Sequence, residues 1–187
     1  MARPDALRSA LFLPVVALGV LFAACSDGTL APTPTSTLTD LPTATAAQVG
    51  EDGAERIEVR IDGLVIEAEV ARTPEERAQG LSGRPALLES AGMLFVFQEE
   101  RRPEFWMKGM RFPLDFIWIS HDRRVVDITR DVPPPEPGTP DDALPLYQPA
   151  EPVLYMLEVN AGVVGEAGLR VGDAVTFEPE VEEEGAQ

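Results

Sequence analysis

The feature that most constrains the fold is a series of short, strand-like apolar runs separated by turn residues. The first two runs, 56–61 and 64–70, alternate apolar and polar residues on either side of Asp62-Gly63. An Asp-Gly pair in that position is typical of a two-residue hairpin turn. Further runs of the same kind occupy 93–97, 104–108, 114–120, 125–130, 153–159 and 174–177. This pattern predicts a mainly β fold, a compact antiparallel sandwich or barrel with one or two short helices.

One short helix is predicted directly after the first hairpin. Thr73 can cap its start, Pro74 suits the first turn, and Glu76 completes a capping box with Thr73. Gly80 can end the helix after about two turns. The sequence therefore places a helix boundary close to the charged residue Arg77.

The remaining connections differ in kind. We expect a second turn of helix at 85–90, a tight turn at His121-Asp122 and a short helix within 161–167. Segment 131–152 is rich in proline, which cannot donate to a strand ladder, so it cannot be a central strand. We expect it to form an ordered surface loop or flap.

The first 24 residues have the features of an export leader. They combine a basic start, an apolar stretch too short for a comfortable span of ~20 residues, and small residues before Cys25. This pattern predicts a lipoprotein signal peptide, residues 1–24, with lipid attached to the single cysteine. Two or three acyl chains would anchor the domain to the cell membrane on its extracytoplasmic side. The alternative is an ordinary signal peptide with an unmodified Cys25.

The rest of the chain divides into three predicted parts. Residues 25–55 comprise the lipidated cysteine and a disordered linker of threonine, proline and alanine, which has too little apolar mass to fold. Residues 56–178 are long enough for one β-rich globular domain with its own core. Residues 179–187 form an acidic disordered tail.

The chain carries a net charge of −17. Nucleic acid is therefore not an expected partner, because binding its phosphates requires basic residues. An anionic lipid surface would also be repelled, which is consistent with attachment through a lipid on Cys25. The oligomeric state stays open.

Several motifs occur together in the globular part. They are Ala71–Leu81, Arg84, Gly92–Phe97, Phe105–Lys108, Pro113–Asp115, Leu157-Glu158 with Ala161-Gly162, and Gly172-Asp173. In combination they resemble the bacterial and archaeal domain-of-unknown-function family 192, over nearly all of residues 57–177. The resemblance implies a compact, mostly β fold of jelly-roll-like type whose members are often exported or lipid-anchored. It implies no particular activity.

Two positions depart from the pattern of that family. Leu-Met is usual where Leu81-Ser82 stands, and Lys-Asn-Thr is usual where Lys108-Gly109-Met110 stands. The second departure removes polar side chains beside the candidate site.

The candidate site combines an indole, cations and carboxylates. In a strand, Trp106 and Lys108 lie on the same face, and Asp115 follows within a short connection. Arg77, from the capped helix, and Glu158, an acid inside an apolar run, could join them. We expect these five residues to bind a small or peptide-like ligand of anionic or amphipathic character. A binding role is expected rather than a catalytic one.

Other roles for the same residues stay open. The carboxylates could form structural ion pairs, with Arg77 or Arg84 joined to Asp115 or Glu158. Asp115 and Glu158 could act as the acid and base of a cell-envelope hydrolase. The domain could also be a purely structural envelope module.

Metal and cofactor chemistry have weaker support. Met93, Met107, Met110, Met156 and His121 offer soft ligands of the kind that bind copper(I) in exported proteins. Methionine inside an apolar run is more often core, so we predict no metal site. The sequence has no Gly-x-Ser-x-Gly elbow and no glycine-rich phosphate loop, and we predict no cofactor.

Overall fold

The computed structural model describes residues 48–49 and 53–181. The predicted signal peptide, Cys25, most of the predicted linker and residues 182–187 lie outside this part of the chain. Neither helix of the described residues is long and apolar enough to cross a bilayer.

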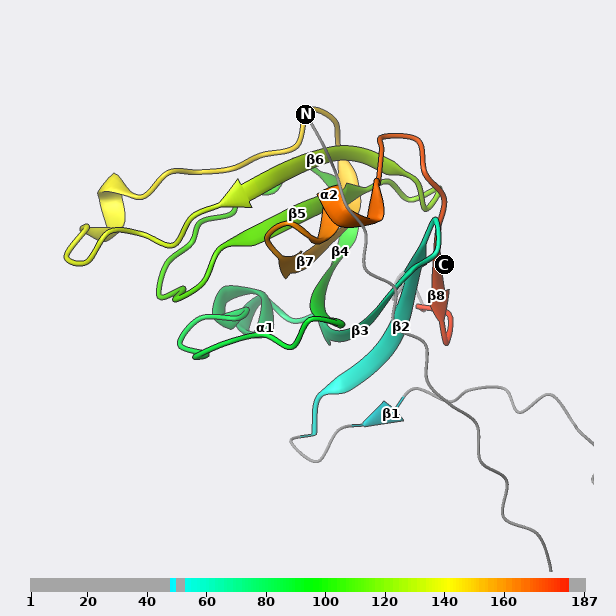
Figure 1. Cartoon of the computed structure of the whole chain (residues 1–187), viewed down its shortest axis with the longest axis horizontal. Helices are drawn as coiled ribbons and strands as arrows, with labels where there is room; N and C mark the ends of the chain where they lie inside the picture. Colours follow the sequence, from blue (N-terminus) through cyan, green and yellow to red (C-terminus); the bar gives the residue numbers. More distant parts are fainter. Residues whose placement is uncertain (1–47, 50–52, 182–187) are drawn as a thin grey trace, which may run out of the picture. The chain divides into compact units, whose positions relative to one another are not determined.

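The described chain forms one sheet with short helices beside it (Figure 1). In chain order the elements are β1 (Gln48–Val49), β2 (Glu55–Ile61), β3 (Leu64–Ala71), α1 (Pro74–Gln79), β4 (Ala91–Arg101), β5 (Leu114–Ile119), β6 (Val125–Val132), the 3-10 helix η1 (Asp141–Ala143), β7 (Val153–Asn160), α2 (Val163–Ala167) and β8 (Val175–Glu178). The strand order is β1-β2-β3-β4-β7-β5-β6, and β8 also pairs with β2. The mainly β prediction is confirmed.

The sheet is mixed and curled. Within the described residues, β3 and β4 are parallel and every other strand pair is antiparallel. Strand β8 pairs with β2 and also reaches the start of β6 through a bridge between Arg124 and Ala174. The sheet therefore bends round toward a half-barrel, and β8 joins elements that are distant in the strand order (Figure 1).

Local sequence signals explain how the first half of the sheet forms. Asp62 and Gly63 have φ of 44° and 88°, as a two-residue hairpin turn of the primed type requires. At α1, the Thr73 hydroxyl accepts from the Glu76 N–H, and the Glu76 carboxylate accepts from the Thr73 N–H. The predicted hairpin and the predicted capping box are both confirmed, and Gly80 ends the helix as expected.

Two predicted elements are absent from the described chain. Segment 104–108 is not a strand, because only Phe105 makes a bridge, to Tyr147, and a turn follows at Lys108. Segment 85–90 contains no helix. Contrary to the prediction from the sequence, Trp106 and Lys108 therefore do not lie on one face of a strand.

The structured part also extends beyond the predicted domain limits. Two residues of the predicted linker, Gln48 and Val49, pair with Arg56 and Glu55 on β2. At the other end, Val181 is buried among the core residues.

The core surrounds strands β4, β7 and β5. All six residues of β5 are buried, as are residues 153–159 of β7. One face of these strands carries Tyr155, which packs against Phe177 of β8 with ring centroids 5.0 Å apart. The opposite face carries Phe95, Phe116 and Met156 and is covered by segment 103–110 and α1. Both faces of these strands are therefore covered by other parts of the chain.

Gly92 supplies a close contact at the centre of the sheet. A Cβ there would lie 2.7 Å from the Glu158 carbonyl oxygen and 2.8 Å from Ile66 Cγ2. We predict that Gly92→Ala lowers the free energy of unfolding by about 1–3 kcal/mol, because the backbone oxygen cannot move aside. Urea unfolding measures this.

Gly165→Ala is the matched control, since a Cβ at Gly165 meets nothing within 4 Å. It lies in α2, where alanine favours the helix, so it should be neutral or slightly stabilising. Equal stability of the two variants would contradict the packing argument.

Candidate functional site

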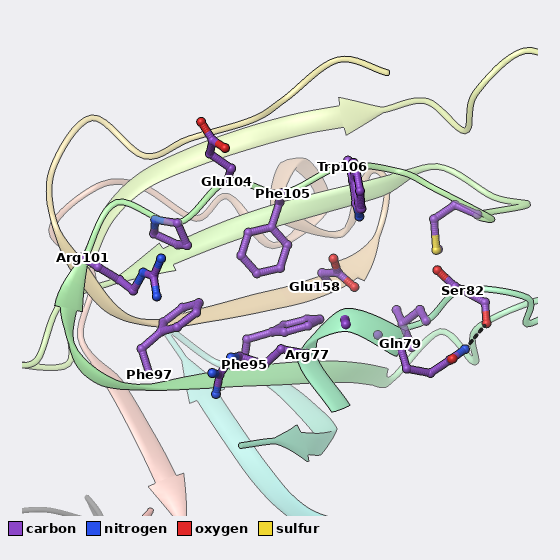
Figure 2. Close-up of a pocket in the computed structure, with 15 residues that line it drawn as sticks. Arg77, Gln79, Ser82, Phe95, Phe97, Arg101, Glu104, Phe105, Trp106 and Glu158 are labelled. Carbon is purple, nitrogen blue, oxygen red and sulfur yellow. Dashed lines mark hydrogen bonds between the residues drawn. The ribbon is translucent and has the colours of Figure 1, made fainter. Parts of the chain in front are cut away.

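A cavity of about 280 Å³ lies between β4, α1 and segment 103–110 (Figure 2). We call it the Glu158 pocket. It is lined by residues 77–82 of α1 and the following turn, by Phe95, Phe97 and Arg101 of β4, by residues 103–106 and Met110, and by Glu158 of β7.

The pocket has an aromatic wall centred on Phe105. Its ring lies 4.9 Å from that of Phe95, 6.4 Å from that of Phe97 and 5.6 Å from that of Trp118, measured between centroids. These are edge-to-face contacts, a favourable arrangement for aromatic rings. Trp106 follows in the chain and remains 46% exposed, so its indole is available to a molecule in the pocket.

The proline-rich segment 131–152 holds this aromatic wall in place. Tyr147 and Phe105 exchange two backbone hydrogen bonds, of 2.8 and 2.9 Å. Beside them, the Gln148 amide donates to the Glu104 carboxylate at 2.8 Å. Asp131 and Val132 still belong to β6 (Val125–Val132), and the rest of the segment is an ordered surface loop, as predicted, which supports one side of the pocket.

Arg77 lies on the α1 side of the pocket. Its guanidinium donates to the carbonyl oxygens of Arg72 and Val96 and lies 5.4 Å from the Phe97 ring centroid. Burial, and then the nearby charge of Arg101, lower the pKa of Arg77 from its usual value. Arg101 lies 5.9 Å from the same ring. Two guanidinium groups thus gather at the Phe97 end of the pocket.

Glu158 lies at the other end, on the sheet (Figure 2). It faces Met93 on β4 and Phe116 on β5 in the strand register, and it is only 5% exposed. Its side chain points into the pocket between Trp106 and α1. Within residues 53–181, no group donates a hydrogen bond to the Glu158 carboxyl and no cation pairs with it.

The buried position of Glu158 changes its protonation. Loss of hydration disfavours the charged form and raises the pKa of Glu158 from 4.5 to about 8. The side chain is therefore mostly a neutral acid at neutral pH. A neutral carboxyl can donate one hydrogen bond and can still accept others.

Three of the five predicted site residues line the pocket, namely Arg77, Trp106 and Glu158. Lys108 does not line it. Its ammonium pairs with Asp141 at 2.5 Å and lies 5.4 Å from the Trp106 ring centroid, on the surface. Lys108 therefore lies on the solvent side of the aromatic wall, outside the pocket.

Asp115 lies away from the pocket, on the opposite face of the sheet. Its register partner is Val159, whereas Glu158 pairs with Phe116, and side chains alternate between faces. The Asp115 carboxylate accepts from the N–H groups of Asp131, Gly162 and Val164 at 2.8 to 3.1 Å. The two carboxyls therefore cannot flank one bond as the acid and base of a hydrolase.

The described chain also lacks the ion pairs that the sequence suggested between Arg77 or Arg84 and the two buried acids, Asp115 and Glu158. Arg84 makes a two-pronged pair with Glu69, with both distances 2.7 Å. Among the described residues, neither Arg77 nor Arg84 pairs with Asp115 or Glu158. The predicted pinning of the sheet by such a pair is absent there.

The possible metal ligands are dispersed. Met93, Met107 and Met156 are buried in the core, and His121 pairs with Glu100 and Asp122 on the surface. No group of three or more histidine, cysteine or acidic side chains in the described chain could hold a metal ion.

Sequence reasoning missed three parts of the pocket. Nothing in the sequence distinguished Phe95 and Phe105 from the other residues of apolar runs, although each lines the cavity. Arg101 ends a strand that is charged along its last residues, so nothing in the sequence distinguished it. Only the fold brings it beside Phe97.

Glu158 should give the protein a specific pH dependence of stability. The folded state holds a proton that the unfolded state releases above about pH 4.5, so this contribution is complete below that pH and is lost as pH rises through about 8. Relative to Glu158→Gln, the wild type should lose on the order of 3–5 kcal/mol of unfolding free energy across this window.

Denaturant unfolding of both proteins between about pH 4 and about pH 10 measures the difference. Glu166→Gln, at an exposed position of α2, is the control and should follow the wild type. Parallel curves for the wild type and Glu158→Gln would show that the carboxyl is not held neutral.

Two proteins of known structure are similar to this chain. A protein of unknown function from Novosphingobium aromaticivorans, solved as a crystal structure, is 32% identical with a TM-score of 0.63; the match covers 71% of this chain and 94% of that one. A protein from Sinorhizobium meliloti, described as a proposed transcription regulator, is 32% identical with a TM-score of 0.60; the match covers 68% of this chain and 98% of that one.

No curated protein matches the chain. A family model does match, over residues 57–177, and it is that of domain-of-unknown-function family 192, described as "Uncharacterized ACR". These residues include the whole Glu158 pocket. The chain belongs to this uncharacterised family.

Proposed function

We propose that the protein binds a small organic ligand and that the Glu158 pocket is its binding site. One observation carries the proposal. A carboxyl that is 5% exposed points into an aromatic-lined cavity and has no hydrogen-bond donor or cation beside it in the described chain. A ligand that pairs with this carboxyl would supply the partner that the described chain does not provide.

The energetic argument favours a binding role over a structural one. Glu158 opens onto the cavity but has lost most of its hydration, which raises its pKa to about 8, and an apolar residue of similar size would avoid that cost. Residues that break the local rules of a core are expected at functional sites. Asp115 shows the contrast, because its buried carboxylate has three backbone donors.

Catalysis has less support than binding. Glu158 is the single buried acid that lines the pocket among the described residues, and Asp115 is on the other face of the sheet. The S. meliloti protein is described as a proposed transcription regulator. For this chain, a role in transcription through direct binding of nucleic acid is disfavoured. The net charge of −17 opposes contact with phosphates.

The proposed location is the extracytoplasmic side of a membrane. The support is the apolar leader 1–24, which ends in small residues before the single cysteine, Cys25. The linker that follows would space the domain from the bilayer. A ligand met there would come from the cell envelope or the medium.

A fragment screen tests the binding role. Small amphipathic compounds are added to the full chain and to Glu158→Gln, and binding is followed by NMR shifts or thermal shift. Ligands of the wild type should bind the variant about tenfold more weakly, because the carboxyl contact is lost. Glu166→Gln should bind like the wild type. Absence of any ligand, or equal binding by Glu158→Gln, would contradict the proposal.

A second test addresses the anchor. Cys25→Ser should abolish incorporation of labelled fatty acid and release the protein from the membrane fraction, because the thiol is the expected attachment point. Ser26→Ala is the control and should remain lipidated. Absence of label from the wild type, or label retained in Cys25→Ser, would contradict lipidation at Cys25.

A further inference from the structure

We infer that the ligand of the Glu158 pocket is a zwitterion, with an amine that pairs with Glu158 and an acid group that pairs with Arg101. This inference rests on the proposed binding function and specifies its chemistry. The pocket has the Glu158 carboxyl at one end and the guanidinium groups of Arg77 and Arg101 at the other, with aromatic rings between them (Figure 2). An elongated ligand with one charge at each end fits that arrangement.

The Glu158 end suits an ammonium group. The carboxyl has no donor in residues 53–181, and the Trp106 indole and the Phe105 ring line the same space. Aromatic faces attract organic cations, and the attraction grows when water is excluded. An ammonium at this end would gain both the carboxylate and the rings.

The opposite end suits an acid group. The guanidinium groups of Arg77 and Arg101 both lie within 6 Å of the Phe97 ring centroid, at 5.4 and 5.9 Å. Arg77 is engaged with two backbone carbonyls. The guanidinium of Arg101 is exposed and makes no hydrogen bond or ion pair within the described residues. It is therefore the group that can bind a carboxylate, with the planar geometry that such pairing favours.

The strand register sets the distance between the two ends. Arg101 of β4 faces Val153 of β7, and Glu158 is five residues further along β7. At about 3.3 Å per residue these two backbone positions are roughly 16 Å apart, and the side chains of Glu158 and Arg101 shorten the gap. The ligand should therefore carry its charges several bonds apart, as in a short peptide or an ω-amino acid.

Binding of the amine should be coupled to loss of the Glu158 proton. Arg77 from α1, Arg101 from β4 and Glu104 from segment 103–110 are the other charged groups that line the pocket. Because Glu158 is protonated at neutral pH, the affinity for the zwitterion should rise up to about tenfold per pH unit until the carboxyl ionises, near pH 8.

A matched series of probes tests the inference on the full chain. ε-Aminohexanoate carries both charges, hexylamine carries the cation alone and hexanoate carries the anion alone. Calorimetric titration at several pH values should show that ε-aminohexanoate binds about tenfold or more tightly than either single-charge probe. Glu158→Gln should remove the advantage of the amine and its pH dependence. Arg101→Gln should remove the advantage of the acid.

The outcomes separate this inference from the proposed function. Equal binding of hexanoate and ε-aminohexanoate, or an unchanged affinity in Glu158→Gln, would overturn the zwitterion. If neutral fragments bind at Glu158 while ε-aminohexanoate does not, the zwitterion is again excluded and the binding function stands. If neither the fragments nor the probes bind, both fail.

Discussion

Residues 92–97 of β4, together with β5 and residues 153–159 of β7, are buried on both faces of the sheet, and the rest of the domain follows from the need to cover them. The curl of the sheet covers one face, where Tyr155 of β7 packs against Phe177 of β8. The other face is covered by segment 103–110 and α1, which are a loop and a helix of six residues. Short irregular elements fill such a surface less completely than a second sheet would. The Glu158 pocket is the space that this cover leaves.

Asp115 and Glu158 show how neighbouring acids in one sheet take different roles. Asp115 is buried where α2 begins, and the N–H groups of Gly162 and Val164 replace its hydration. It therefore ties α2 to β5 on the curled side. Glu158 is almost as deeply buried on the other side but receives no such donors in the described chain. The two acids thus lie on opposite faces of the sheet: the carboxylate of Asp115 has a structural role, and the carboxyl of Glu158 is available to a ligand.

The sequence predicted the locally determined features of this domain. The hairpin at Asp62-Gly63 and the capping box of α1 depend on residues within a few positions of each other, and both were predictable. Glu158 was also visible, because an acid interrupts a continuous apolar run. Features that depend on distant contacts were not. The parallel pairing of β3 and β4 and the bridge between Phe105 and Tyr147 require the completed fold.

The same distinction explains the candidate site. Placing Lys108 beside Trp106 depended on treating 104–108 as a strand, but this segment is held by the proline-rich loop instead of by a sheet ladder. The same loop also binds Lys108, whose ammonium pairs with the carboxylate of Asp141 in η1. Arg101 was not distinguishable, since its role depends on which ring it approaches. Burial of an acid can be read from a run of residues, whereas the composition of a pocket cannot.

The protonation of Glu158 connects the stability of the domain with the choice of ligand. With a pKa of about 8, the carboxyl is mostly neutral at pH near 7, so folding does not bear the full cost of a buried charge. A ligand that requires the carboxylate must provide about 1.4 kcal/mol for each pH unit below that pKa. Contact of an ammonium with aromatic rings contributes about 0.5–2 kcal/mol, and pairing with the carboxylate adds to it. A cation can therefore displace the proton, whereas a neutral ligand would gain one hydrogen bond and leave the carboxyl protonated.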